Sequence, residues 1–170
     1  MGNVKVTKDL ANKTLTVERL FKAPKDRLWR AYADKDWFVQ WWGPEGWETT
    51  VKEFDFRPGG RNHYGMKCVD ENQGEWFGQT SWGLMNYEVI DEPNSLSYKD
   101  FFADEDGKAQ EDLPALTMTI KLVETDGQTN VVSIVQGDTA EDIEKVVQMG
   151  MVEGYTSSAD RLEKLIASEQ

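Results

Sequence analysis

Hydrophobic and polar residues alternate near the start of the chain. Between residues 13 and 21, Leu15 and Val17 fall on one face and polar residues such as Thr16 fall on the other. A period of two is typical of a strand with one buried face. The pattern therefore predicts a first strand over 13–21.

The spacing then becomes helical. Leu28 and Tyr32 lie four residues apart after Pro24, which favours the first turn of a helix. A second short helix is predicted to begin near Asp34. It must end before Pro44, because a proline disfavours a helical conformation in the residue that precedes it. Two short helices are therefore expected after the first strand.

The region from residue 47 to about 134 consists of short β-rich runs separated by turn signals. Arg57-Pro58-Gly59-Gly60 is one such signal and Asp126-Gly127 is another. Asp-Gly between two alternating runs is the strongest of them, because both residues tolerate the positive φ of a tight hairpin turn. Six strands joined by hairpins are predicted here.

The last part of the chain predicts one long amphipathic helix. Asp138-Thr139-Ala140-Glu141 is typical of a capping box, and apolar residues follow at three-and-four spacing as far as Ile166. A sheet with one face to cover and one long helix to cover it gives an α+β helix-grip fold. We therefore expect a single domain over 1–170, in which a curved antiparallel sheet of about seven strands wraps around the C-terminal helix.

Composition and charge exclude several classes of partner. The 170 residues carry 31 acidic against 19 basic side chains, a net charge of -12, which disfavours nucleic acid and anionic membrane surfaces. Cys68 is the single cysteine and allows no intrachain disulfide. No run of eighteen apolar residues and no signal-peptide pattern occurs, so we expect a cytoplasmic protein without membrane insertion.

Several short motifs occur in a characteristic order. They are Phe21-Lys22-Ala23-Pro24, Leu28-Trp29-Arg30-Ala31, Trp41-Trp42-Gly43-Pro44-Glu45, Asp55-Phe56-Arg57-Pro58-Gly59-Gly60, Glu88-Val89-Ile90-Asp91-Glu92-Pro93 and Gly154-Tyr155. Together they resemble the START-like (SRPBCC, helix-grip) superfamily, in the branch of the heat-shock chaperone ATPase activator homologues. The resemblance implies a cavity between the sheet and the last helix. It also implies relatives that bind hydrophobic small molecules, act on polyketides, confer resistance or assist a chaperone.

Aromatic residues and methionines on the inward faces are the candidate cavity lining. Such residues offer apolar contact area with a few polar tips, which is what a small-molecule pocket needs. Core packing is the better explanation for any one of them alone, and the prediction is that several of them together line one cavity. Gly150 and Gly154 on the apolar helix face would provide either space or close packing. The predicted ligand-binding residues are Trp41, Trp42, Tyr64, Met66, Trp82, Tyr98, Met118, Met151 and Tyr155.

The sequence assigns no catalytic residue, metal site or cofactor. His63 is the sole histidine, and strand alternation places it on the face opposite Tyr64. One histidine and one cysteine fall short of a zinc site. The acidic turn at Asp104–Gly107 lacks the later glutamate of a calcium loop, since position 115 is alanine.

Three functional hypotheses remain at this point. The first is noncovalent binding of an apolar or aromatic small molecule, with no reaction catalysed. The second is a cyclase-like or hydrolase-like enzyme in which Tyr64, Tyr98 or His63 orients the ligand. The third is a chaperone-interacting regulator. We expect this role least, because the full-length eukaryotic activators that the chain resembles carry a further N-terminal domain, for which these 170 residues have no room. A homodimer is compatible with this kind of fold.

Overall fold

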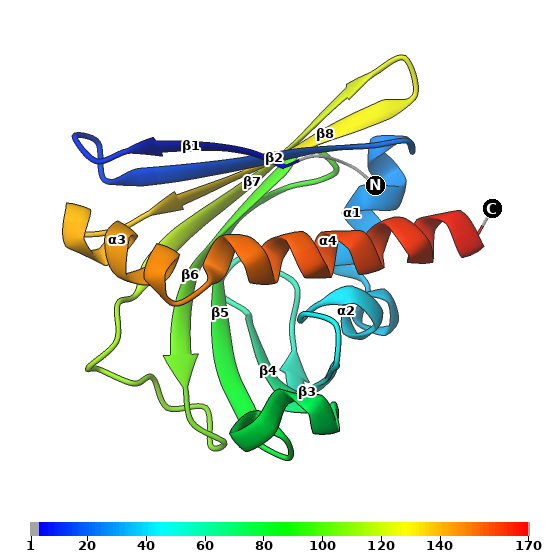
Figure 1. Ribbon diagram of the computed structural model, residues 1–170. Helices are drawn as coiled ribbons and strands as arrows, with labels where there is room; N and C mark the ends of the chain where they lie inside the picture. Colours follow the sequence, from blue (N-terminus) through cyan, green and yellow to red (C-terminus); the bar gives the residue numbers. More distant parts are fainter. Residues whose placement is uncertain (1–3, 170) are drawn as a thin grey trace.

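The computed structural model describes residues 4–169, which form one eight-stranded sheet and four α-helices (Figure 1). The strands are β1 (Lys5–Asp9), β2 (Thr14–Phe21), β3 (Trp47–Phe54), β4 (Arg61–Cys68), β5 (Thr80–Asp91), β6 (Ser95–Ala103), β7 (Leu116–Thr125) and β8 (Gln128–Gln136). The helices are α1 (Lys25–Ala33), α2 (Lys35–Trp41), the 3-10 segment η1 (Glu71–Trp76), α3 (Ala140–Gln148) and α4 (Met151–Ser168).

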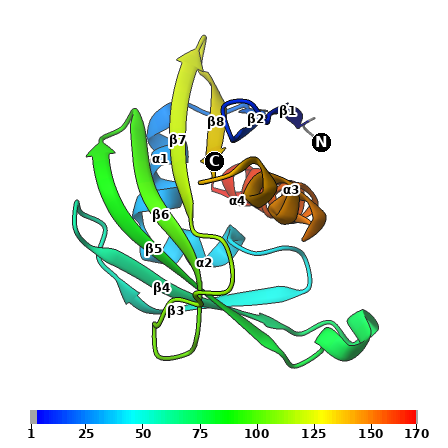
Figure 2. The same cartoon turned by 90° about the vertical axis from the view of Figure 1, so that its left-hand side faces the viewer.

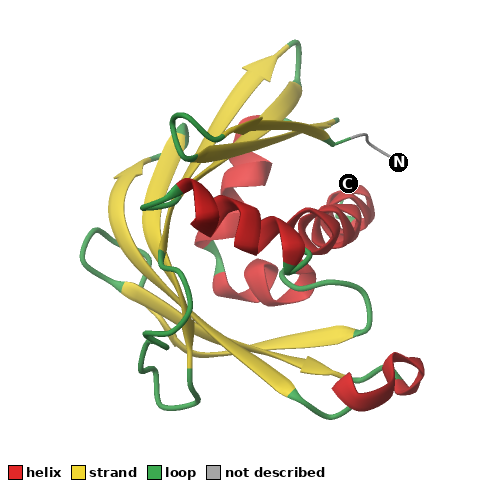
Figure 3. Cartoon of the chain, turned by 60° about the vertical axis from the view of Figure 1, so that its left-hand side comes forward, coloured by secondary structure: helices red, strands yellow, loops and turns green. Residues whose placement is uncertain are grey.

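All strand pairs are antiparallel, in the order β1-β2-β8-β7-β6-β5-β4-β3. The sheet curves around α4, which crosses its concave side, while α1 and α2 close one end (Figures 1 and 3). Figure 2 shows β7 and β8 rising beside α4, with β3 and β4 at the opposite end of the sheet. The structure therefore confirms the predicted α+β helix-grip fold.

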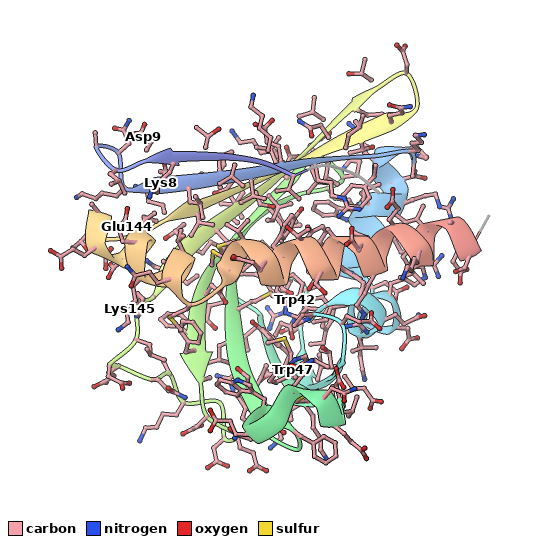
Figure 4. All side chains as sticks on the ribbon, in the orientation of Figure 1. Lys8, Asp9, Trp42, Trp47, Glu144 and Lys145 are labelled. Atoms are coloured by element: carbon pink, nitrogen blue, oxygen red, sulfur yellow. The ribbon has the colours of Figure 1, made fainter. Side chains whose placement is uncertain are left out.

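The predicted sheet lacked one strand. The strand missing from the prediction is β1, whose residues are almost all exposed, so it carries no apolar alternation to reveal it. It pairs with β2 along the edge of the sheet. An ion pair of 2.9 Å between Lys8 and Glu144 also joins this edge to α3 (Figure 4). Main-chain pairing, rather than a buried face, specifies this strand.

The other predicted strands and turns are observed. In β2, Leu15 and Val17 are buried, as the alternation requires. The β7–β8 hairpin turns at Asp126 and Gly127 with φ of 54° and 79°, the geometry of a type I′ turn. Asp34 caps α2 by accepting a 2.9 Å hydrogen bond from the backbone N–H of Asp36.

The predicted long C-terminal helix is in fact two helices. Thr139, rather than Asp138, caps α3, and its hydroxyl accepts a 3.1 Å hydrogen bond from the Asp142 N–H. The helix breaks at Gly150, which has φ of +91° and starts α4 in a new direction. Apolar spacing continues across the break, which explains why periodicity alone missed it.

Candidate functional site

A cavity of about 270 Å³ lies between the concave face of the sheet and the helices. Its wall combines side chains of β2, β4, β6, β7 and β8 with α1, the end of α2, the α3–α4 junction and α4. The lining residues are Val17, Tyr32, Trp41, Trp42, Gly43, Pro44, Tyr64, Met66, Tyr98, Asp100, Phe102, Met118, Ile120, Ser133, Val135, Val146, Met149, Gly150, Met151, Gly154, Tyr155 and Ser158.

The structure brings eight of the nine residues predicted for the cavity to its wall. These eight are Trp41, Trp42, Tyr64, Met66, Tyr98, Met118, Met151 and Tyr155. They come from α2, from three different strands and from α4, so only the tertiary fold assembles them. The sequence predicts these residues on the inward faces of strands and helices, and the fold brings those faces together around the cavity.

Trp82 does not line this cavity. It pairs with Gly65, and its ring lies over that glycine on the opposite face of the sheet, beside His63 at a ring distance of 5.3 Å. The Lys52 ammonium lies 4.8 Å from the centre of the same ring. Because neighbouring strand residues face opposite sides, an inward Gly83 requires an outward Trp82. The prediction for Trp82 was therefore wrong about its face.

An aromatic wall forms one end of the cavity. Trp42 stacks on Phe38 at 5.0 Å and meets the edge of Tyr64 at 5.8 Å. Tyr64, from β4, extends across Gly83 of β5, where a side-chain Cβ would clash with the phenol ring. Glycine at position 83 is thus what allows the Tyr64 ring to reach toward β6 and the middle of the cavity.

Asp100 is the one ionisable carboxyl among the lining residues, and sequence reasoning missed it. It lies on β6 between Tyr98 and Phe102, which share its face because they are two residues away on either side. That alternation was the available signal. Acidic residues ordinarily lie in turns and on solvated surfaces, so a carboxyl on an inward strand face is unusual.

The electrostatics of the cavity differ from those of the surface. Burial raises the pKa of Asp100 from 3.8 to about 7. Burial also raises the pKa of Tyr32 and Tyr64 well above 10, with a further contribution to Tyr64 from the Asp100 charge. The cavity therefore holds neutral phenols and a carboxyl that changes its protonation state near neutral pH.

The glycines of the C-terminal segment border open space. A Cβ placed on Gly150 or Gly154 would meet no atom within 4 Å, and both residues line the cavity. Of the two alternatives, these glycines therefore leave open space in the cavity and do not serve close packing of the helix on the sheet. Met149, beside this break, is 49% exposed, so this side of the cavity reaches the surface.

The loop after α2 is fastened to α4. Arg161 donates hydrogen bonds to the carbonyl oxygens of Gly43 at 2.7 Å and Trp47 at 3.2 Å. Ser157 accepts a 2.8 Å bond from the N–H of Glu45. Since Gly43 and Pro44 border the cavity, these bonds hold one wall of the site against the helix.

His63 and Cys68, the other residues considered for chemistry, are both buried away from the cavity lining. His63 lies on the outer face, as alternation predicts, but it is buried there, with Nε2 3.0 Å from the Asp104 carbonyl oxygen. Cys68 is a buried free thiol. Within residues 4–169, no group of three or more His, Cys, Asp or Glu side chains is placed to hold a metal ion. None of the described helices is long and apolar enough to cross a membrane.

A curved antiparallel sheet gripping a C-terminal helix around an apolar cavity defines the START-like helix-grip class. Residues 22–167 match the model of one family within it, described as Activator of Hsp90 ATPase homolog 1-like protein. The chain belongs to this family. No match was found among curated proteins.

Solved structures of several bacterial proteins share the fold across almost the whole of this chain. Protein Ms6760 from Mycobacterium smegmatis is 35% identical, with 96% of each chain covered and a TM-score of 0.85. A protein from Arthrobacter aurescens is 27% identical, covering 96% of this chain and 91% of its own, with a TM-score of 0.86. The AHSA1 protein from Silicibacter pomeroyi, at 23% identity and a TM-score of 0.70 over 92% and 99% of the two chains, shows the same fold.

Proposed function

We propose that the protein binds an apolar or aromatic small molecule noncovalently in the cavity between the sheet, α2 and α4. The observation that carries this proposal is the lining itself, which is almost entirely aliphatic, aromatic and methionine side chains around about 270 Å³. This volume is close to the lower end of the range for small-molecule sites, roughly 300–1,000 Å³. The family assignment is consistent with a ligand-binding domain.

The predicted lining residues have distinct roles in this proposal. Trp42 and Tyr64 offer flat aromatic contact, and Met118 and Met151 offer adaptable contact that tolerates ligands of different shape. Tyr64 and Tyr98 add hydroxyl groups that can orient a bound molecule. The ligand would thus be held mainly by apolar burial, at about 25 cal/mol per Å², and oriented by a few polar groups.

The first test is native mass spectrometry of the protein purified from its own host, followed by extraction and identification of what travels with it. A stoichiometric apolar compound supports the proposal. Thermal shifts with a panel of small aromatic compounds provide the second arm, because a ligand that binds only the folded state raises the unfolding temperature. A protein that carries nothing and that no aromatic probe stabilises would contradict it.

A pair of variants at one position makes this test specific. Gly154→Phe would place a ring in the open space beside Gly154, whereas Gly154→Ala adds only a methyl group there. The phenylalanine variant should keep its fold and lose binding of the probes, and the alanine variant should retain it. Equal binding by both variants would place the probes outside the cavity.

An enzymatic function is the second candidate, and Asp100 is the observation that favours it. A carboxyl whose burial gives it a pKa of about 7 can accept or donate a proton at neutral pH, and the phenols of Tyr64 and Tyr98 lie in the same cavity. Turnover of a bound ligand that is abolished by Asp100→Asn would support this reading. Binding without turnover supports the binder.

A chaperone-directed role rests on the family's name alone. Addition of the purified protein to an Hsp90 ATPase assay tests it directly. Unchanged ATP hydrolysis would remove this alternative. The oligomeric state, for which a homodimer is one expectation, is measured in the same preparation by light scattering.

A further inference from the structure

Asp100 is a carboxyl group without an ionic partner inside an apolar cavity. Among residues 4–169, no basic side chain lines the cavity, and burial is the single cause of the shift in the pKa of this group. Carboxylates in other parts of the protein have such partners: Asp160, for example, lies 2.7 Å from the Arg19 guanidinium. The fold thus leaves Asp100 free to pair with something that enters the cavity.

The neighbours of Asp100 suit a positive charge. The titratable groups that line the cavity with it are the phenols of Tyr32 from α1, Tyr64 from β4, Tyr98 from β6 and Tyr155 from α4. Burial raises the pKa of each of these phenols, so they are neutral near pH 7. Aromatic faces attract cations through the ring quadrupole, whereas nothing in this lining would neutralise an anion.

We propose that the ligand is an apolar, aromatic-sized molecule carrying a basic nitrogen, and that Asp100 is the residue that selects it. The inference rests on the proposed function and adds the chemical class of the ligand. The ammonium group would pair with the Asp100 carboxylate beside Tyr64 and Tyr98, and the hydrocarbon part would fill the space bordered by Met118 and Gly154. A fatty acid or another carboxylate would be rejected by the buried charge of the same group.

Binding of the ammonium form should release a proton from Asp100 when the pH lies below the pKa of this group. At about pH 6 the free protein holds Asp100 mainly as the neutral acid, and the complex holds it as a carboxylate, so up to about one proton is released for each amine bound. The affinity for the amine should rise with pH up to about 7 and then level off. A neutral ligand should show no such release.

The experiment compares three probes of one shape: naphthalen-2-ylmethanamine, the corresponding alcohol naphthalen-2-ylmethanol, and 2-naphthoic acid. Calorimetry at about pH 8 should show the amine binding the wild-type protein roughly 10- to 100-fold more tightly than the alcohol, as expected for a hydrogen bond to a charged group. The acid should bind least. Titrations near pH 6 in buffers of different ionisation enthalpy should report the released proton.

Two variants separate the Asp100 effect from the general acidity of the protein. Asp100→Asn should abolish the preference for the amine and the proton release, while the alcohol still binds. Asp138→Asn removes the same charge from an exposed position outside the cavity and should leave the amine-to-alcohol ratio unchanged.

The outcomes distinguish this inference from the function on which it rests. Equal binding of the amine and the alcohol by the wild-type protein would overturn the inference and leave the binder function standing. A preference that survives Asp100→Asn would also overturn it. If none of the three probes binds, both the inference and the proposed function fall. The comparison of probes on the wild-type protein remains decisive even if the Asp100 variant does not fold.

Discussion

Arg161 of α4 donates a 2.7 Å hydrogen bond to the carbonyl oxygen of Gly43, in the loop that follows α2. The same guanidinium also reaches the carbonyl oxygens of Pro44 and Trp47. A single planar donor group therefore satisfies several carbonyls of one turn, which suits the fork geometry of arginine. The loop that closes the cavity is held by this side chain.

Replacement of Arg161 should loosen that wall. Arg161→Ala removes charge-assisted bonds to several backbone acceptors and should lower the free energy of unfolding by about 1.5–3 kcal/mol. Any bound probe should also dissociate faster, because Gly43 and Pro44 border the cavity. Urea denaturation and stopped-flow dissociation measure the two effects.

The control for this change is Arg57→Ala. Arg57 pairs with Asp55 at 2.9 Å on the surface, with 69% of its side chain exposed, and exposed pairs contribute about 0–1 kcal/mol. Equal losses in the two variants would show that Arg161 does not act through the loop.

Two glycines four residues apart should respond in opposite directions to the same substitution. Gly154 lies within α4 with no atom within 4 Å of an added Cβ, so Gly154→Ala should stabilise the protein by up to about 1 kcal/mol through helix propensity. Gly150 has φ of +91°, and Gly150→Ala should destabilise by roughly 1 kcal/mol or more, because an L side chain rarely adopts that conformation. Thermal unfolding of both variants tests the pair; a shift of the same sign would contradict the assigned geometry.

The sequence was sufficient for the parts of the fold in which hydrophobic periodicity and turn chemistry agree. The β7–β8 hairpin is an example, since Asp126 and Gly127 separate two alternating strands. The exposed edge strand β1 has no such period, and only its pairing with β2 defines it. The break at Gly150 was missed because apolar spacing continues from α3 into α4.

Counting faces along a strand is enough to place some side chains on the cavity wall. Tyr64, Tyr98 and Met118 follow that rule. Trp82 lies on the outer face because Gly83 occupies the inward position under the Tyr64 ring. Asp100 was not predicted in the cavity for a different reason. Placing a carboxyl without a partner in an apolar site is costly, and composition does not indicate where a fold accepts that cost.

The packing of Tyr64 across Gly83 should appear as strong coupling between the two positions. Gly83→Ala places a methyl group in the phenol ring and should destabilise the protein by about 1–3 kcal/mol, as expected for overpacking. Tyr64→Leu removes the ring and should rescue most of that loss. A double-mutant cycle by urea denaturation measures the coupling energy; additive effects would show that the ring does not lie where the structure places it.

The partly buried carboxyl of Asp100 predicts a pH-dependent stability of defined sign. Its pKa is raised from 3.8 to about 7 in the folded protein, so the folded state holds a proton that the unfolded state has released. Below about pH 4 both states are protonated and Asp100 contributes no difference. As the pH rises from about 4 to about 7, this group progressively destabilises the fold, and above about 7 the loss is constant.

Asp100→Asn removes the titration, so its stability relative to the wild-type protein should rise across that pH interval. The full gain is on the order of 2–4 kcal/mol, at about 1.4 kcal/mol per pKa unit and with allowance for solvent that reaches the cavity. Asp9→Asn is a control that should stay nearly flat, because hydrogen bonds from Asn12 lower the pKa of Asp9 from 3.8 and this carboxyl therefore titrates at or below the acid end of the measured range. Urea denaturation of the three proteins from about pH 4 to about pH 8 gives the differences directly. A difference between wild type and Asp100→Asn that stays flat over this range would show that Asp100 titrates normally and is not held in an apolar cavity.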